Sequence, residues 1–369
     1  MKVNIPEHIK AIVPYPPGKP VDELEREYGI RQAIKLASNE NSWGPSPRAL
    51  EAIHEELKGL HRYPDGAAYN LTQALAQHLG CDAANIVLGN GSNEVIEFLV
   101  KASIRHGDGV ITSHPSFLMY QKFVQIRGGD NVVIPLNEMR HDFSAILQAV
   151  TEKTRLIFLD NPNNPTGTAF TRAEFLDFCR QLPESVIVVL DEAYVDFVDP
   201  QQQIDAIELI LQNRGPALVS LRTFSKAYGL AGLRVGFGVM SAELASVLHR
   251  VRQPFNINTL GQVGALAALL DDEHYRRTID GTHAGLRYLS QEVAKLGCKP
   301  YPSQANFFLI DVRGDADPLY EAMLHKGLIV RSMTPYGLKS FIRVTVGTEA
   351  ENERFLIALR ESVGSLGYV

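Results

Sequence analysis

Lys226 lies in a stretch whose residue types could support covalent chemistry, RTFSKAYGLAGLRVGF at residues 222–237. The apolar run ALVSL precedes it and predicts a buried strand, so Lys226 would lie in a turn at that strand's carboxyl end. In open α/β sheets this edge is the usual ligand crevice. Thr223, Ser225 and Arg234 offer groups that bind a phosphate monoester. A desolvated lysine near cations suits Schiff-base chemistry, so the stretch predicts a reactive amine beside a phosphate site.

Two further polar clusters follow predicted strands and would lie at the same edge. The run RLIFLD leads into NPNNPTG, which contains Asn164, and VIVVLD ends at Asp191 with Tyr194 three residues later. Each cluster alone has an ordinary explanation as a turn, a helix cap or a half-buried aromatic residue. Their occurrence in order, each at a strand terminus, indicates a single site shared with Lys226.

A helix start forms another candidate for phosphate binding. The run NIVLGNG predicts a strand, and SNEVIEFLVKASI predicts a helix with Ser92 or Asn93 at its cap. Free N–H groups and the helix dipole favour an anion at such a terminus. GNGSNE lacks the third glycine of a dinucleotide fingerprint, so it is only a weak signal for a nicotinamide cofactor.

These residue types match the needs of pyridoxal 5′-phosphate. The cofactor requires an amine for its aldehyde, an acid for its pyridine nitrogen and donors to its ring oxygen. Lys226 and Asp191 fit the first two roles, and the pair Asn164 and Tyr194 fits the third. Phe117 in HPSF could cover the ring, although a lone phenylalanine is also a normal core residue. The groups that could share the phosphate charge are Ser92, Asn93, Thr223, Ser225 and Arg234.

The elements that must position these residues alternate between strands and helices. Short apolar runs and helical patterns follow one another as far as Arg250, which predicts a mostly parallel sheet covered by helices on both faces. Helix starts are expected at Ser46 with Pro47 and at Thr171. After Pro254 the pattern changes and predicts a smaller α+β domain. The expected organisation is an N-terminal arm at 1–35, a large domain at 36–254 and a small domain at 255–369.

Composition excludes several classes of protein. The 369 residues include 36 Lys and Arg against 42 Asp and Glu, and this net charge of −6 disfavours nucleic acid as a partner. MKVNIPEHIK lacks the apolar core of a signal peptide, and LGQVGALAALL is too short to span a membrane. Three widely spaced cysteines without a CxxC motif suggest neither disulfides nor a metal site. We therefore expect a protein of the reducing cytoplasm.

The motifs NPNNPTG, DEAY and SKAYGLAGLRVG, at these relative positions, resemble those of the fold-type I pyridoxal-phosphate aminotransferases over nearly the whole chain. The resemblance implies an α/β fold with a large, mostly parallel sheet flanked by helices, plus a smaller α+β domain. It also implies three catalytic residues. Lys226 would hold the cofactor as a Schiff base and carry the substrate proton, Asp191 would stabilise the pyridinium, and Tyr194 would act beside them.

Within that family the chain is similar to the histidinol-phosphate aminotransferases, because of PYPPGKP, LASNEN with WGPSP, RYPDG and VRSM with IRVTVGT. This similarity implies a ping-pong exchange in histidine biosynthesis. L-Histidinol phosphate and 2-oxoglutarate would be interconverted with imidazole-acetol phosphate and L-glutamate. It also implies a homodimer with shared active sites, in which Tyr63 reaches the cofactor phosphate of the other subunit. Arg343 would bind the carboxylate of glutamate and 2-oxoglutarate.

Three further residues are candidates for substrate binding, and the charge of the substrate points to two of them, Arg331 and Tyr15. The phosphate of histidinol phosphate carries more charge than a carboxylate, so one arginine would leave charge uncompensated in a desolvated site. Arg331 offers a second cation, and we expect it to serve the phosphate substrate more than glutamate. Tyr15, which is either an anchor for the arm or a ligand contact, could close over the same group. Asn41 in LASNEN is a further substrate-binding candidate.

Other functions remain open on this scaffold. Relatives transaminate phenylalanine or tyrosine, and others decarboxylate threonine phosphate. Some relatives also place Trp or Tyr where this chain has Phe117, which can stack but cannot form a hydrogen bond. A cofactor-binding regulator without turnover is disfavoured, because the lysine, the aspartate and the substrate-side arginines are all present and no DNA-binding segment is attached.

Overall fold

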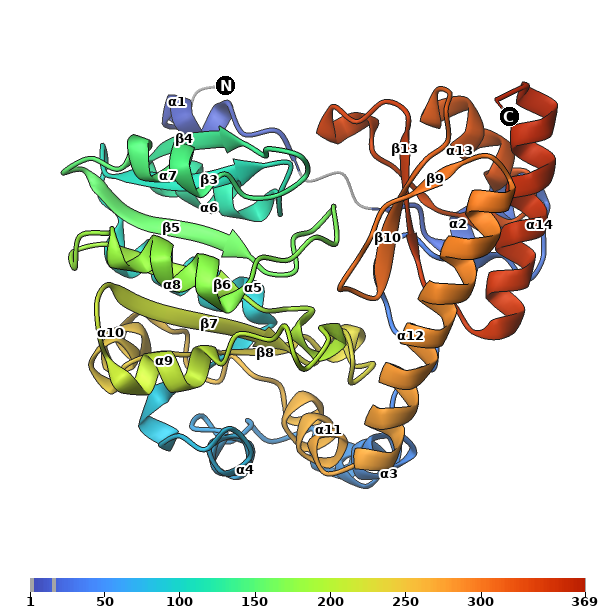
Figure 1. Cartoon of the computed structure of the whole chain (residues 1–369). Coiled ribbons are helices and arrows are strands. Elements are labelled where there is room, and N and C mark those ends of the chain that lie inside the picture. The colour runs from blue at the N-terminus through green and yellow to red at the C-terminus, as the bar shows by residue number, and fades with distance from the viewer. Residues whose placement is uncertain (1–2, 15–17, 369) are drawn as a thin grey trace.

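The computed structural model describes residues 3–14 and 18–368, and it consists of two α/β units joined side by side (Figure 1). The larger unit contains a seven-stranded sheet with strand order β2-β8-β7-β6-β5-β3-β4. The smaller unit contains a four-stranded sheet, β12-β13-β10-β9, and a two-stranded sheet, β1-β11. The α/β class expected from the sequence is therefore confirmed.

The large sheet is mostly parallel, as expected. Strands β3 to β7 pair in parallel, whereas β8 is antiparallel to both β7 and β2. Strand β8 was not expected from the sequence, because the two glycines of VGFGV weaken its strand signal. In chain order the strands are β2 (Ile86–Asn90), β3 (Gly109–His114), β4 (Asp130–Pro135), β5 (Thr154–Asp160), β6 (Ile187–Asp191), β7 (Ala217–Thr223) and β8 (Val235–Val239).

Helices cover both faces of this sheet because side chains alternate along each strand. In β5, Leu156 and Phe158 join one buried cluster with α5, α6 and α10, and Ile157 and Leu159 join another with α7, α8 and α9. The helices are α5 (Ser92–Ser103), α6 (Met119–Arg127), α7 (Phe143–Ala149), α8 (Arg172–Arg180), α9 (Ala206–Gln212) and α10 (Ala242–Val251). α1 (Glu7–Lys10) lies beside α6, where Gln125 Nε2 donates to His8 O at 3.3 Å.

A third helical layer packs against the β2 and β8 edge of the sheet. It consists of α3 (Pro47–Glu56), α4 (Tyr69–Leu79) and α11 (Thr259–Leu269). Ala265 and Leu269 of α11 share a buried cluster with Phe237 of β8. Because α11 packs on the large unit, we propose a boundary between α11 and α12, later than the expected position near Pro254. α12 (Asp272–Lys295) then runs from the large unit to the small one (Figure 1).

The small unit has its own core, to which the N-terminal segment contributes. Ile34 and Leu36 belong to the buried cluster that contains Phe308 and Phe355, and Leu24 packs with Leu324. We therefore propose that residues 18–35, expected as an arm, form part of this unit. Its elements are α2 (Val21–Tyr28), β1 (Ile34–Lys35), β9 (Lys299–Pro300), β10 (Phe307–Asp311), α13 (Ala316–Leu324), β11 (Leu328–Ile329), β12 (Arg331–Ser332), β13 (Phe341–Thr345) and α14 (Glu349–Leu366).

Helix caps follow the sequence signals closely. Ser46 Oγ accepts from Ala49 N before α3, and Thr171 with Glu174 forms a capping box before α8, which confirms both expected starts. The expectation of Ser92 or Asn93 as the cap of α5 was wrong by one or two residues. Gly91 is the cap, since its φ of 78° is readily adopted by glycine. None of the described helices is long and apolar enough to cross a membrane.

Gly236→Ala in β8 should destabilise the large unit, because β8 lies directly against the start of α5. A Cβ at Gly236 would lie 2.1 Å from Ser92 N and 2.7 Å from Gly91 C, and backbone atoms cannot move aside cheaply. We expect the free energy of unfolding to fall by about 2 kcal/mol in denaturant titrations of the apoprotein. Gly232→Ala is the matched control, since its Cβ meets nothing within 4 Å and should change stability by less than about 0.5 kcal/mol. Equal stability of the two variants would contradict this packing argument.

Candidate active site

A pocket of about 460 Å³ opens at the carboxyl edge of the large sheet, where residues of the small unit close it. Strands β5, β6 and β7 end here, as expected for a ligand crevice in an α/β sheet. Most of the residues predicted from the sequence line this pocket. They are Ser92, Asn93, Phe117, Asn164, Asp191, Tyr194, Thr223, Ser225, Lys226, Arg234, Arg331 and Arg343.

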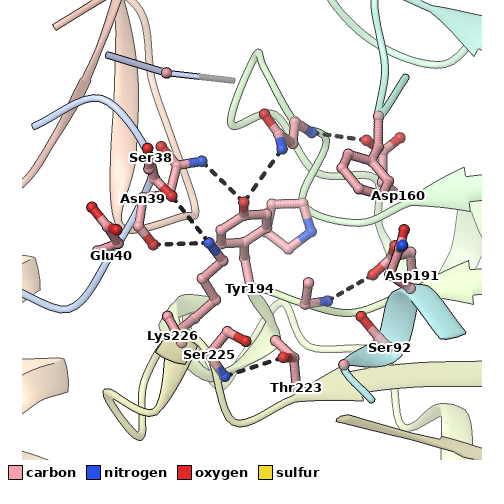
Figure 2. A pocket seen from close by; sticks show the side chains of 18 of the residues that line it. Ser38, Asn39, Glu40, Ser92, Asp160, Asp191, Tyr194, Thr223, Ser225 and Lys226 are labelled. Carbon is pink, nitrogen blue, oxygen red and sulfur yellow. Dashed lines mark hydrogen bonds between the residues drawn. The ribbon is translucent and has the colours of Figure 1, made fainter. Parts of the chain in front are cut away.

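Lys226 occupies the centre of the pocket in a desolvated position (Figure 2). Its Nζ donates to the carbonyl oxygens of Ser38 at 3.2 Å and Asn39 at 3.0 Å, and it lies 5.5 Å from the centroid of the Tyr194 ring. Burial, reinforced by the charge of Arg343, lowers its pKa from 10.5 to about 7. A substantial fraction of the amine is therefore neutral and nucleophilic near neutral pH.

Asp191 lies at the end of β6 and faces the same pocket. Its carboxylate accepts from the Tyr120 hydroxyl at 2.7 Å and from Ala193 N at 3.1 Å. Burial raises its pKa from 3.8 to about 6, and the hydrogen bond from Tyr120 opposes this shift. A buried carboxylate of this kind is well suited to bind a protonated ring nitrogen.

The Tyr194 hydroxyl lies between two side-chain amides. It accepts from Asn39 Nδ2 at 2.9 Å and from Asn164 Nδ2 at 3.3 Å. Burial raises the pKa of Tyr194 to about 12, so the phenol keeps its proton at neutral pH. Because both amides donate to the oxygen, the phenolic proton is available to a ligand oxygen in the pocket.

The residues at the start of α5 form a cradle that fits a phosphate group. The N–H groups of Ser92 and Asn93 belong to the first helical turn, where no intrahelical acceptor exists. Asn93 Oδ1 is buried without a hydrogen-bond partner in the described part of the chain. Arg234, held in the left-handed region at φ 58°, points across this space, and a Cβ at Gly91 would lie 2.6 Å from its NH2.

Thr223 and Ser225 shape the turn that carries Lys226. Thr223 Oγ1 accepts from Ser225 N at 3.1 Å, and Arg234 NH1 donates to Ser225 Oγ at 3.5 Å. These bonds hold the hydroxyls and the guanidinium on the same side of the pocket as α5. The set of groups therefore fits the phosphate, aldehyde and ring nitrogen of the expected cofactor.

Two arginines of the small unit line the opposite end. Arg331 on β12 and Arg343 on β13 are direct cross-strand neighbours. Arg343 is 7% exposed, donates from NH2 to Ala37 O at 2.8 Å, and donates from NH1 to Asn164 Oδ1. Adjacent like charges on paired strands are unfavourable by themselves, so this end of the pocket favours an anionic ligand.

Among the described residues, two predicted ones, Asn41 and Tyr63, do not line the pocket. Asn41 donates to Ala227 O at 2.9 Å and accepts from Trp43 N at 2.8 Å, so its amide braces two loops. Its expected role as a ligand contact is not supported by this position. Tyr63 is 83% exposed and stacks on Phe255 at 4.9 Å, away from the pocket of its own chain. Tyr15 lies outside the described residues.

Several pocket residues were not predicted from the sequence, and three of them, Asp160, Tyr120 and Asn39, form hydrogen bonds with predicted site residues. Asp160 ends β5 at the position paired with Asp191, so the strand-end argument could have found it. Tyr120 and Asn39 carry no local signal, because their contacts depend on α6 and on the 36–41 segment reaching the sheet edge.

Phe117 lines the pocket with its ring 5.4 Å from that of Tyr120, at an interplanar angle of 80°.

Comparison with known proteins gives consistent matches. A family model described as aminotransferase class I and II matches residues 31–359. The chain is 60% identical to the histidinol-phosphate aminotransferase of Desulfotalea psychrophila over 370 residues, covering 100% of this chain and 98% of that protein. A crystal structure of histidinol-phosphate aminotransferase from Sinorhizobium meliloti, in complex with pyridoxal-5′-phosphate, has a TM-score of 0.89 at 30% identity and covers 97% of each chain. This likeness confirms the expected fold-type I class.

The lowered pKa of Lys226 predicts the pH dependence of cofactor uptake by the apoprotein. Only the neutral amine attacks an aldehyde, so the rate should rise through pH 7 and level off above about pH 8. Stopped-flow absorbance with added pyridoxal 5′-phosphate measures this rate. A rate that keeps rising to pH 10 would show an ordinary lysine pKa, and Lys226→Ala should lose the phase entirely.

Tyr120→Phe should move the acid limit of cofactor binding to higher pH. The Tyr120 hydroxyl stabilises the charged form of Asp191, so its removal raises the Asp191 pKa above about 6. As the solution is acidified, Asp191 then becomes protonated at a higher pH and no longer pairs with the ring cation. Cofactor affinity measured between pH 5 and pH 8 tests this, with Tyr301→Phe, whose ring packs on Phe341 in the small unit, as the control. Superimposable profiles for Tyr120→Phe and the wild type would refute the assigned role.

Proposed function

Because the chain belongs to the aminotransferase class I and II family, we propose that it transfers the amino group of L-histidinol phosphate to 2-oxoglutarate, with pyridoxal 5′-phosphate as its cofactor. The products are imidazole-acetol phosphate and L-glutamate, and the reaction belongs to histidine biosynthesis. The observation that carries this proposal is the presence of separate cationic ends in one pocket, with the reactive amine between them. One end suits the cofactor phosphate, and the other suits an anionic substrate.

The residues present can hold this cofactor in a single orientation. We assign the phosphate to the start of α5, Ser225 and Arg234, and the pyridine nitrogen to Asp191. Tyr194 and Asn164 lie where they can direct donors at the ring oxygen, and Phe117 can cover one ring face. When bound, the cofactor supplies an electron sink that stabilises the charge left on the substrate carbon after its proton departs.

Lys226 is the proposed proton carrier. Its amine is neutral in a substantial fraction of molecules near neutral pH, so it can accept a proton from the substrate carbon and return it at the other end of the transfer. Asp191 stays charged above its pKa of about 6, and this charge keeps the ring nitrogen protonated. The pKa of Tyr194, raised to about 12 by burial, keeps its hydroxyl a donor throughout.

The paired arginines give the site its proposed substrate preference. A phosphate monoester presents up to about two negative charges, and two adjacent guanidiniums match it better than one. Arg343 is braced by Asn164 and by the carbonyl of Ala37, so it offers a fixed site for the carboxylate of glutamate. Arg331 lies beside it on β12, and we propose that it adds the second contact for the phosphate substrate.

We also propose that the enzyme works as a homodimer with shared active sites. Large apolar side chains are exposed close together in sequence around Tyr63, and such patches mark interaction surfaces. Leu50, Leu57 and Leu60 are 52%, 45% and 53% exposed, and Phe255, which stacks on Tyr63, is 47% exposed. Tyr63 would reach the cofactor phosphate of the other subunit from this surface.

A cytoplasmic location is part of the proposal. Cys81, Cys179 and Cys298 are free thiols, which suits a reducing compartment. Burial raises the pKa of the Cys179 thiol to about 12 and that of Cys298 to about 11, so both behave as small core residues.

Steady-state assays with three amino substrates test the proposed function. With 2-oxoglutarate as acceptor, kcat/KM for histidinol phosphate should exceed that for phenylalanine by at least about 100-fold, because phenylalanine presents a singly charged carboxylate to the paired arginines in place of a more highly charged phosphate. Threonine phosphate should release no carbon dioxide.

Arg331→Ala should raise KM for histidinol phosphate by about tenfold and KM for glutamate by less than about threefold.

Control measurements distinguish an error in the assignment of Arg331 from an error in the assignment of the substrate. Arg360→Ala removes an exposed arginine of α14 and should leave both KM values unchanged. Equal impairment of both substrates in Arg331→Ala would contradict the assignment of Arg331 while leaving the aminotransferase reaction intact. Faster turnover of phenylalanine, or release of carbon dioxide from threonine phosphate, would overturn the substrate assignment.

A further inference from the structure

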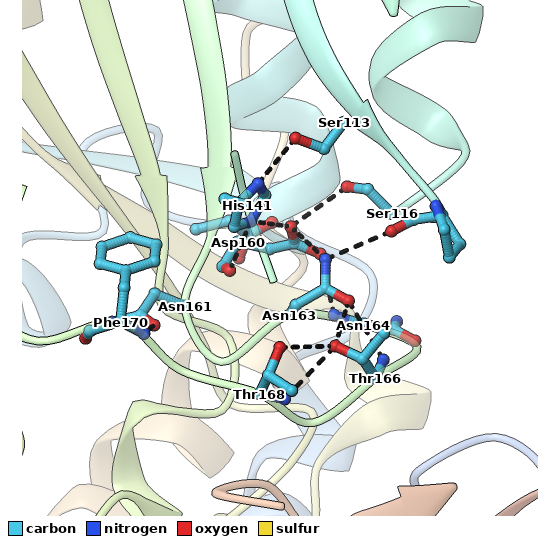
Figure 3. A network of polar contacts seen from close by, with 12 residues as sticks. Ser113, Ser116, His141, Asp160, Asn161, Asn163, Asn164, Thr166, Thr168 and Phe170 are labelled. Carbon is cyan, nitrogen blue, oxygen red and sulfur yellow. Dashed lines mark hydrogen bonds and ion pairs between the residues drawn. The ribbon is translucent and has the colours of Figure 1, made fainter. Parts of the chain in front are cut away.

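Asp160 is a buried carboxylate next to the active site that the proposed reaction does not use directly. It ends β5, is 3% exposed, and contributes to the pocket wall beside Asp191. Its two oxygens accept four hydrogen bonds (Figure 3). Oδ1 accepts from Ser116 Oγ at 3.1 Å, His141 Nε2 at 3.0 Å and Asn163 Nδ2 at 2.9 Å, and Oδ2 accepts from Asn164 N at 2.9 Å.

These donors come from three separate segments of the large unit. Ser116 follows β3, His141 precedes α7, and Asn163 and Asn164 lie in the loop after β5. Asp160 therefore ties together three loops at the sheet edge. A carboxylate is required for this, because a side-chain amide has only one acceptor oxygen and could not serve both groups of donors.

His141 is the partner that fixes the direction of this carboxylate. Its side chain is 2% exposed, its Nε2 lies 3.0 Å from Asp160 Oδ1, and its Nδ1 lies 2.7 Å from Ser113 Oγ. With the proton on Nε2, the ring donates to Asp160 and accepts from the Ser113 hydroxyl. Both ring nitrogens are then satisfied, and the imidazole is held in one orientation.

Asn164 connects the hydrogen bonds around Asp160 to the active site. Its backbone N–H is held by Asp160, and its side chain forms two functional contacts. Nδ2 donates to the Tyr194 hydroxyl at 3.3 Å, and Oδ1 accepts from Arg343 NH1. A continuous path of hydrogen bonds therefore runs from His141 to the residue proposed to bind the substrate carboxylate.

We propose that Asp160, oriented by His141, is a positioning residue that fixes Asn164 and thereby aims both Tyr194 and Arg343 at their ligands. The proposal rests on the function proposed above and adds the residues that set the geometry of its anion site. Neither His141 nor Asp160 is assigned a contact with the substrate. Their influence passes through Asn164, so it should vanish when the Asn164 side chain is removed.

The position of Asp160 next to Asp191 is electrostatically unfavourable, which indicates that Asp160 has a function. Asp160 and Asp191 are paired positions on neighbouring parallel strands, and the charge of Asp160 contributes to the raised pKa of Asp191. A second carboxylate at this edge is therefore unfavourable for the cofactor's acid partner. The four hydrogen bonds to Asp160 offset that repulsion, and the loop they order is the one that carries Asn164.

A double-mutant cycle tests the proposal on the full-length enzyme with its cofactor. His141→Leu removes both ring nitrogens at similar volume, and His141→Gln restores a donor near the position of Nε2. His141→Leu should raise KM for glutamate about tenfold with kcat changed by less than about threefold, and His141→Gln should recover most of the loss. In an Asn164→Ala background, His141→Leu should change KM by less than about twofold, because the path is already broken.

Additive effects of His141→Leu and Asn164→Ala would overturn the proposal, as would failure of His141→Gln to recover KM. If His141→Leu does not fold, Ser113→Ala replaces it, since it removes only the hydroxyl that holds Nδ1. Ser113→Ala should raise KM for glutamate about threefold, and this increase should be lost in the Asn164→Ala background. Arg140→Ala, in the same loop and paired only with surface Glu174 in the described contacts, should leave KM unchanged. Failure of the wild type to transaminate histidinol phosphate would instead reject the proposed function.

Discussion

The desolvation of Lys226 is the constraint on which the rest of the site depends. Its amine is buried and points at the carbonyl oxygens of Ser38 and Asn39, and burial with the nearby charge of Arg343 brings its pKa to about 7. An amine paired closely with a carboxylate would instead remain protonated and unreactive. The carbonyls that contact it belong to a segment between the two units, so the reactivity of Lys226 depends on the joining of both.

That joining is achieved by the chain between β1 and α3. Ile34 and Leu36 belong to the core of the small unit, whereas Ser46 caps α3 on the large one. Between them, the Asn39 side chain donates to the Tyr194 hydroxyl, and the Asn39 backbone N–H donates to Thr345 Oγ1 at 3.0 Å. This short segment therefore links the small sheet, the reactive lysine and the tyrosine in one set of contacts.

Charge is distributed along the pocket in a way that orients a ligand. The carboxylates of Asp160 and Asp191 lie at the ends of β5 and β6, Arg234 lies beside the start of α5, and Arg331 and Arg343 lie on the small sheet. A molecule with a phosphate at one end and a cationic ring nitrogen elsewhere can satisfy these charges in one orientation. The same separation leaves the paired arginines for a second anion. The Asn164 side chain connects the two regions, because it bonds both Tyr194 and Arg343.

The sequence alone determined the alternation of strands and helices, the helix starts at Ser46 and Thr171, and the strand-end residues Lys226, Asp191 and Asn164. These follow from local periodicity and capping, and parallel strands necessarily bring their carboxyl ends to one edge. The placement of α11 and the contacts of Asn41, Tyr120, Asn39 and His141 were decided by tertiary structure. Each depends on packing between segments far apart in the chain, which a local pattern does not encode. The pKa of Lys226 was also decided by tertiary structure, because desolvation is a property of the assembled pocket and not of the residue type.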